Sequence, residues 1–178
     1  MDKAILPECF ADTLLAETLV PTKIGYSHQA SCFKVESAMK HGRLNDSFAL
    51  GIVDNDKTTI SYLKDFTLLA EQPDKLLLWK HPAKPHYIIQ ICPALERWVL
   101  DVCDQAGIST EDFGIKNDLE ALKNITKRES SLQHEGLCKL FKAIRARQDH
   151  PSIRKLTNWI QLLRDHNYHV SEEALKQA

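Results

Sequence analysis

The sequence predicts an α/β fold: a sheet with parallel strands and crossover helices, followed by a C-terminal helical segment. Two observations lead to this prediction. Over residues 1–92, short apolar runs of strand length alternate with apolar residues at helical spacing, which is typical of strand–helix–strand units. Over residues 93–178, only helical spacing occurs. We therefore expect an α/β domain in the first half and a helical extension packed on it.

The expected elements of the first half are bounded by prolines, glycines and acids. The first apolar run stops at Pro7, and the helix after it stops at Pro21. The clearest run, SFALGIV, is almost wholly apolar and is followed by acids, which is typical of a central strand covered on both faces. We expect strands near residues 4–6, 23–26, 47–53, 76–79 and 87–91, and helices near residues 10–20, 29–40 and 58–70.

Four helices are expected in the second half. Pro93 is well placed as the first residue of a helix, with Trp98 on its apolar face, and Gly107 ends that helix. The remaining apolar stripes place helices at roughly residues 116–129, 132–148 and 151–166.

Composition excludes several classes of protein. Of 178 residues, 43% are hydrophobic and 26% charged, with a net charge of −1, so bulk charge indicates neither a nucleic-acid nor a membrane partner. No stretch approaches the ~20 apolar residues that span a bilayer. The 5 cysteines are odd in number and widely separated, which is typical of reduced thiols. These features predict a cytoplasmic protein.

Acidic residues follow two of the expected strands. Glu8 closes the first strand with Asp12 one helical turn later, and Asp54 and Asp56 follow the central strand. Spacings like these also arise by chance, so the evidence lies in the position of the acids at the ends of strands. Ligands of open α/β sheets bind beyond the carboxyl ends of the strands. If the two strands are neighbours, four carboxylates converge there and repel one another unless a cation neutralises them. Oxygen ligands without clustered His or Cys favour Mg²⁺ or Mn²⁺, which suits phosphodiester chemistry.

This arrangement resembles the Toprim (topoisomerase–primase) superfamily. In that superfamily a Glu ends the first strand, an Asp follows four residues later, and a D-x-D ends a later apolar strand. The likeness covers about residues 3–92. It is closest to small stand-alone Toprim-like proteins and to the nuclease half of OLD-type (overcoming lysogenization defect) proteins. Cys9 stands where the family often has Gly.

The resemblance implies a role for each acid. Glu8 would act as general acid or base or as a metal ligand, and Asp54 and Asp56 would hold Mg²⁺. Asp12 would be an auxiliary acidic ligand. OLD-like members also carry an acid after the D-x-D, for which Glu96 is the candidate here.

The function implied is a Mg²⁺-dependent nuclease that cleaves phosphodiester bonds in DNA or RNA, with a role in phage or mobile-element defence by analogy. Topoisomerases and primases need further domains, for which we expect no room in this chain. OLD-like proteins commonly work with an ATPase, so an ATPase partner subunit is also implied, and the helical half offers a face for a homo-oligomer. The alternative is a non-catalytic Toprim-like binding or regulatory subunit of such a complex.

Each acid also has a simpler structural interpretation. Glu8 and Asp12 fit an acidic helix N-terminus that complements the helix dipole. Asp54 and Asp56 fit a polar turn or a helix cap, and Asp54 alone fits a receiver-like phosphoacceptor. Glu96 fits a solvated acid in the first turn of a helix.

Basic residues and histidines offer weaker candidates. Lys80, His81 and Lys84 lie between the last two expected strands, and would contact nucleic acid if that loop overhangs the acids. The alternative is an ordinary solvated hairpin tip. His28 falls near the same edge as the acids, where a structural histidine is the alternative. The basic run over residues 139–147 fits the solvated face of a helix.

Overall fold

The computed structural model describes residues 3–55, 60–73 and 75–178. Five strands form one mixed sheet in the order β1-β2-β5-β4-β3. β1, β2 and β5 are parallel to one another, and β4 pairs antiparallel with both of its neighbours, β5 and β3. The strands are β1 (Ile5–Pro7), β2 (Ala49–Asp54), β3 (Thr67–Gln72), β4 (Leu76–Lys80) and β5 (His86–Ile91).

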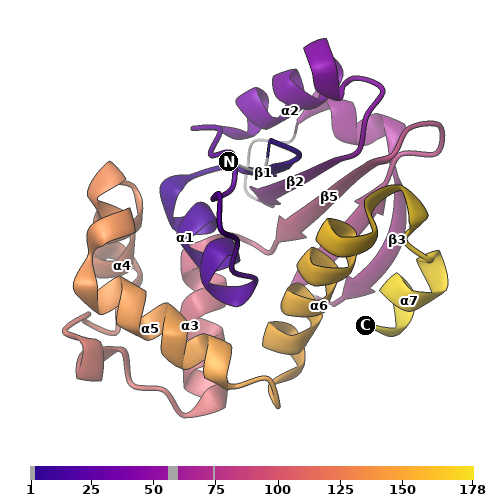
Figure 1. The fold of residues 1–178 in the computed structure, drawn as a ribbon. Coiled ribbons are helices and arrows are strands. Elements are labelled where there is room, and N and C mark those ends of the chain that lie inside the picture. Colours follow the sequence, from indigo (N-terminus) through magenta and orange to yellow (C-terminus); the bar gives the residue numbers. More distant parts are fainter. Residues whose placement is uncertain (1–2, 56–59, 74) are drawn as a thin grey trace.

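Helices cover both faces of the sheet (Figure 1). Side chains alternate along β2: Leu50 and Ile52 face the larger hydrophobic cluster, whereas Ala49 and Val53 face a smaller one that includes the helix α2. Both faces of the sheet are therefore buried, one against α2 and the other against the larger cluster. The α-helices are α1 (Phe10–Leu19), α2 (Cys32–Lys40), α3 (Leu95–Ala106), α4 (Leu119–Thr126), α5 (Glu135–Ala146), α6 (Pro151–His166) and α7 (Glu172–Gln177).

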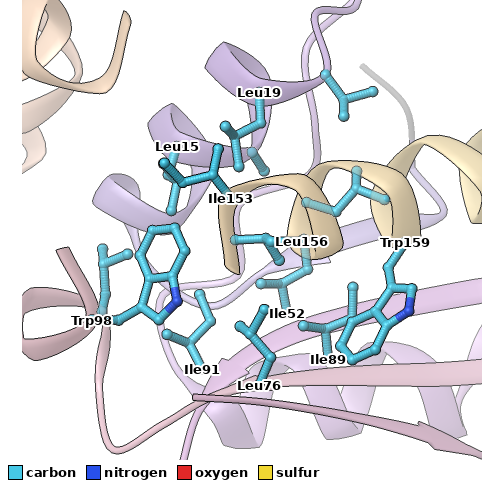
Figure 2. Close-up of a cluster of buried hydrophobic side chains, with 14 of the residues drawn as sticks. Leu15, Leu19, Ile52, Leu76, Ile89, Ile91, Trp98, Ile153, Leu156 and Trp159 are labelled. Carbon is cyan, nitrogen blue, oxygen red and sulfur yellow. The ribbon is translucent and has the colours of Figure 1, made fainter. Parts of the chain in front are cut away.

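The larger cluster joins the two halves of the sequence. Figure 2 shows side chains of α1, the sheet, α3 and α6 meeting in one apolar layer. The helical half therefore completes the core of the sheet. The labelled members are Leu15, Leu19, Ile52, Leu76, Ile89, Ile91, Trp98, Ile153, Leu156 and Trp159.

The α/β class and the parallel neighbours β1 and β2 agree with the sequence prediction, but the segment expected as a helix over residues 58–70 does not. Its described part is a short 3₁₀ helix, Ser61–Asp65, followed by strand β3. The spacing of three between Ile60, Leu63 and Phe66 fits a 3₁₀ turn as well as an α-helix, and all three are buried. Pairing with β4 then extends the chain as an edge strand.

Two smaller expectations were also wrong. Residues 23–26 form no strand: only Tyr26 makes an isolated bridge, and its N–H donates to Glu17 Oε1 at 2.8 Å. The helix after β5 begins at Leu95 rather than at Pro93, because Asp54 supplies the acceptor for the Leu95 N–H at 2.9 Å. Within the described ranges, no helix is both long and apolar enough to cross a membrane.

Candidate active site

Glu8 and Asp54 meet at one edge of the sheet. Because β1 and β2 are parallel neighbours, their carboxyl ends coincide, and the Glu8 N–H donates to Ile52 O at 2.9 Å. The Asp54 N–H in turn donates to Glu8 Oε2 at 3.2 Å. Residues 46 positions apart in sequence are thus in direct contact, where sheets of this class bind ligands.

Asp12 lies behind this edge as a helix cap. Its Oδ2 accepts from the Cys9 N–H at 3.0 Å, and Cys9 Sγ accepts from the Asp12 N–H at 3.3 Å, which closes a reciprocal capping box at the start of α1. Asp12 is only 1% exposed, so it is shielded from any substrate. Its Oδ1 is buried with no hydrogen-bond partner in the described part of the chain.

Asp54 links the sheet to α3. Its Oδ1 accepts from the Leu95 N–H at 2.9 Å, so a carboxyl at the end of β2 satisfies a donor at the N-terminus of a helix that follows β5. Asp54 therefore caps α3, which lies far later in sequence than the helix expected near residue 58, the one that the alternative interpretation had Asp54 cap.

Glu96 is a buried acid, so its interpretation as a solvated residue was wrong. It is 8% exposed, and its Oε1 accepts from Thr126 Oγ1 at 2.5 Å. This bond ties the first turn of α3 to the last turn of α4. Glu96 also lies close enough to Asp12 and Asp54 for its charge to raise the pKa of both.

Burial and mutual repulsion keep protons on this cluster. Burial, opposed by hydrogen bonds from Cys9 and reinforced by the charges of Glu8 and Glu96, raises the pKa of Asp12 to about 7. Burial first and the Asp12 charge second raise the pKa of Asp54 to about 9. Burial also raises the pKa of the Cys9 thiol far above its usual range, so Cys9 is a neutral thiol rather than a nucleophile. Without a cation, the cluster is partly protonated at neutral pH.

A cavity of about 460 Å³ opens beside these acids. Its lining includes the acids Glu8, Asp54 and Glu96, together with two basic residues, Lys123 of α4 and Lys127 directly after this helix. The complete lining is Glu8, Cys9, Phe10, His28, Ala30, Asp54, Ala94, Glu96, Lys123, Thr126 and Lys127.

The sequence indicated some of this lining. His28 lies in it, as the sequence suggested, but Phe10, Lys123 and Lys127 were not identified. Local sequence carries no signal for the two lysines, because only the packing of α4 against α3 brings them over the carboxyl edge of the sheet.

Asp56, expected as a metal ligand, lies outside the described residues. Within the described ranges, no three His, Cys, Asp or Glu side chains lie close enough together to hold a metal ion. The described acids of the cluster, Glu8, Asp12, Asp54 and Glu96, are linked through hydrogen bonds and charge rather than arranged as a ready set of ligands.

Lys80, His81 and Lys84 lie at the other end of the sheet, so the condition for their contact with nucleic acid beside the acids, that the loop overhangs them, is not met. Lys80 pairs in register with Tyr87 near the start of β5, whereas Asp54 pairs with Ile91 at its end. Four residues at ~3.3 Å each separate the two ends by roughly 13 Å.

The three side chains already have partners there. Lys80 Nζ lies 2.6 Å from Glu172 Oε1, and Lys84 Nζ donates to Asn45 Oδ1 at 2.7 Å. His81 Nδ1 accepts from the Ala83 and Lys84 N–H groups. Their hydrogen bonds are those of an ordered hairpin connection.

Comparisons of the chain with protein-family models, with curated proteins and with solved structures found no match. The likeness to Toprim proteins thus remains an expectation drawn from the acidic motif.

Proposed function

We propose that the chain is a Mg²⁺-dependent nuclease-like protein that cleaves phosphodiester bonds in nucleic acid, as the resemblance to Toprim proteins implies. The contact between Glu8 and Asp54 is the observation that carries the proposal, because it joins the two parts of the motif at the ligand-binding edge of the sheet. We also propose a cytoplasmic location, in keeping with the separated cysteines.

The donor set suits a hard divalent cation. Carboxylate oxygens are the ligands that Mg²⁺ and Mn²⁺ prefer, and Glu8 and Asp54 bring two carboxyl groups together in the lining of the cavity. We propose that Glu8 and Asp54 hold the ion together with Asp56 from the adjoining segment. Such an ion would neutralise phosphate charge and favour ionisation of an attacking water.

The remaining acids position this pair. Asp12 fixes the first turn of α1 directly after Glu8 through its bond to Cys9. The Leu95 N–H holds one oxygen of Asp54, which orients that carboxyl. Glu96 and Asp12 add negative charge that makes a bound cation more favourable. Asp12 and Glu96 are therefore positioning residues in this proposal, and Glu8 is the candidate general base.

Cleavage assays test the proposal. Labelled DNA and RNA, each single- and double-stranded, would be incubated with the protein in Mg²⁺, in Mn²⁺ and in EDTA. We expect cleavage that requires metal and falls about 100-fold or more in Glu8→Gln and Asp54→Asn variants. Glu111→Gln and Asp112→Asn, exposed acids in the 3₁₀ helix Thr110–Phe113, are matched controls that should retain activity. Cleavage that survives EDTA or both site variants would overturn the proposal.

A non-catalytic binding or regulatory subunit is the second candidate, and one observation favours it. Asp12 accepts from the Cys9 N–H and Asp54 from the Leu95 N–H, so both carboxyl groups have a structural use at helix N-termini without any reaction. An ATPase partner and a role in phage or mobile-element defence remain part of either proposal. Absence of cleavage, both alone and with an ATPase that co-purifies with the chain, would favour the subunit.

A further inference from the structure

The cavity beside the acids contains a stacked pair of rings for which the proposed cleavage has no use. Phe10, the first residue of α1, and His28, in the connection before α2, lie nearly parallel, with ring centroids 3.8 Å apart and an interplanar angle of 15°. Both rings are only partly buried and both line the cavity. The cavity lining therefore includes an aromatic pair.

Such a pair suits a nucleobase. Bases stack on aromatic side chains in single-strand binding sites, and the interaction tolerates any sequence because every base has a π-face. Burial lowers the pKa of His28, which favours the neutral imidazole at neutral pH. A neutral ring continues such a stack without placing a positive charge next to the base.

The lysines supply the complementary site for phosphate. Lys123 and Lys127 are four residues apart at the end of α4, so they point from the same side of the helix into the cavity lining. Lys123 lies 3.2 Å from Glu120, but the Glu120 side chain is 76% exposed, so this ion pair is weak and a phosphate could replace it. The cavity lining thus combines an aromatic pair, basic residues and acidic residues.

The size of the cavity limits what enters it. A volume of about 460 Å³ lies within the range of small-ligand sites, which is the scale of one nucleotide rather than of a duplex. A base inside a duplex has both faces covered by its neighbours, so it could stack on the rings only after leaving the helix.

We propose that this cavity accepts one unpaired nucleotide of a single-stranded nucleic acid, with its base on Phe10 and His28 and its phosphate facing Lys123 and Lys127. The proposal rests on the proposed function, since it assigns a substrate class to the same site. It places the phosphodiester between the lysines and the contact of Glu8 with Asp54.

Binding measured separately from cleavage tests it. The Glu8→Gln variant would be used in Mg²⁺ so that binding is measured without cleavage. Fluorescence anisotropy would report its affinity for a labelled single strand of about ten nucleotides and for the same strand annealed to its complement. A mononucleotide would then be tested as a competitor of the labelled single strand. We expect the single strand to bind at least about fivefold more tightly than the duplex. The mononucleotide should compete only at much higher concentration, because it lacks contacts outside the cavity.

Substitutions then locate the site. Phe10→Leu should weaken single-strand binding by about fivefold or more, which is the loss of one stacked base. Phe33→Leu, at a ring that is 59% exposed on α2, is the matched control and should change nothing. Lys127→Ala should reduce the slope of log affinity against log salt by about 0.7, whereas Lys142→Ala on the exposed side of α5 should not. His28→Ala, which changes a residue outside the helices, should also weaken single-strand binding.

The outcomes separate this proposal from the proposed function. If the protein cleaves nucleic acid but binds single strand and duplex equally well, the nucleotide site is overturned and the proposed nuclease is not. The same holds if Phe10→Leu and Phe33→Leu, both folded, have equal effects on single-strand binding. Ring-dependent binding without cleavage supports the site and removes the nuclease. Failure of every probe to bind, or competition by the mononucleotide at the strand's own affinity, overturns the site.

Discussion

Asp12 and Asp54 make the metal-free protein less stable as the pH rises, which is the opposite of the usual effect of a carboxyl group. An isolated Asp has a pKa near 3.8, whereas the fold raises the pKa of Asp12 to about 7 and that of Asp54 to about 9. Between about pH 4 and pH 9 the folded state therefore binds more protons than the unfolded state. The stability that these two groups contribute is full below about pH 4 and is lost as the pH rises through this window.

We predict that the melting temperature in EDTA falls between pH 7 and pH 9, above the range in which histidines titrate, and that Asp54→Asn reduces this fall. The amide keeps an acceptor for the Leu95 N–H but carries no charge, so at pH 8 the variant should melt about 2–4 °C or more above the parent. Thermal denaturation followed by circular dichroism measures this. Asp112→Asn, an exposed acid, is the control and should leave the profile unchanged. A profile of Asp54→Asn that matches the parent's would contradict the raised pKa.

At the scale of elements, the bond between Thr126 and Glu96 holds α4 against α3. Both residues are nearly inaccessible, at 2% and 8% exposed, so loss of the hydroxyl would leave a buried carboxylate oxygen without its donor. We predict that Thr126→Val lowers the free energy of unfolding by about 1–3 kcal/mol. Because α4 carries Lys123 and Lys127, the same change should also weaken single-strand binding.

Urea denaturation of Thr126→Val and of a matched variant measures this effect. Thr18→Val on α1 removes a hydroxyl that donates to Leu14 O of its own helix, so it should change stability by no more than about 0.5 kcal/mol. Equal stability of the two variants would show that the contact between α3 and α4 does not depend on Glu96.

The sequence predicts an element well where one periodicity and one boundary signal agree. Helix α6 begins at Pro151 and ends at His166, as its apolar stripe and initial proline indicated. Strand β3 was missed because its apolar residues also fit helical spacing, and the partner that settles the matter, β4, follows a turn. Local periodicity cannot decide such a case, since cross-strand pairing supplies the deciding free energy.

The candidate site divides in the same way. Glu8 and Asp54 could be predicted to meet, because strands in parallel α/β sheets present their carboxyl ends at one edge. The burial of Asp12 in a capping box, the bond from Thr126 to Glu96 and the lysines of α4 could not. The burial of Asp12, the bond between α3 and α4 and the position of the two lysines all depend on how helices pack together, which no local pattern specifies.

For the whole molecule, the shared core implies that the two halves of the sequence fold as one cooperative unit. Leu156 of α6 is 1% exposed and lies among Ile52, Leu76 and Trp159 in Figure 2, so a residue of the helical half fills the core of the sheet. We predict that Leu156→Ala lowers the free energy of unfolding by about 2–5 kcal/mol. The loss should be felt equally in the sheet and in the helices, because neither half has a complete core without the other.

Amide hydrogen exchange read by peptide mass spectrometry distinguishes this from two independent units. In Leu156→Ala, peptides covering β2 and peptides covering α6 should lose protection by the same factor. Leu162→Ala, at a partly buried position on the same helix, is the matched control and should cost less. Loss of protection confined to α6, with β2 unchanged, would mean that the acidic edge is built by an autonomous sheet. The cavity wall formed by α4 would then belong to a separable module rather than to the same folded unit as Glu8 and Asp54.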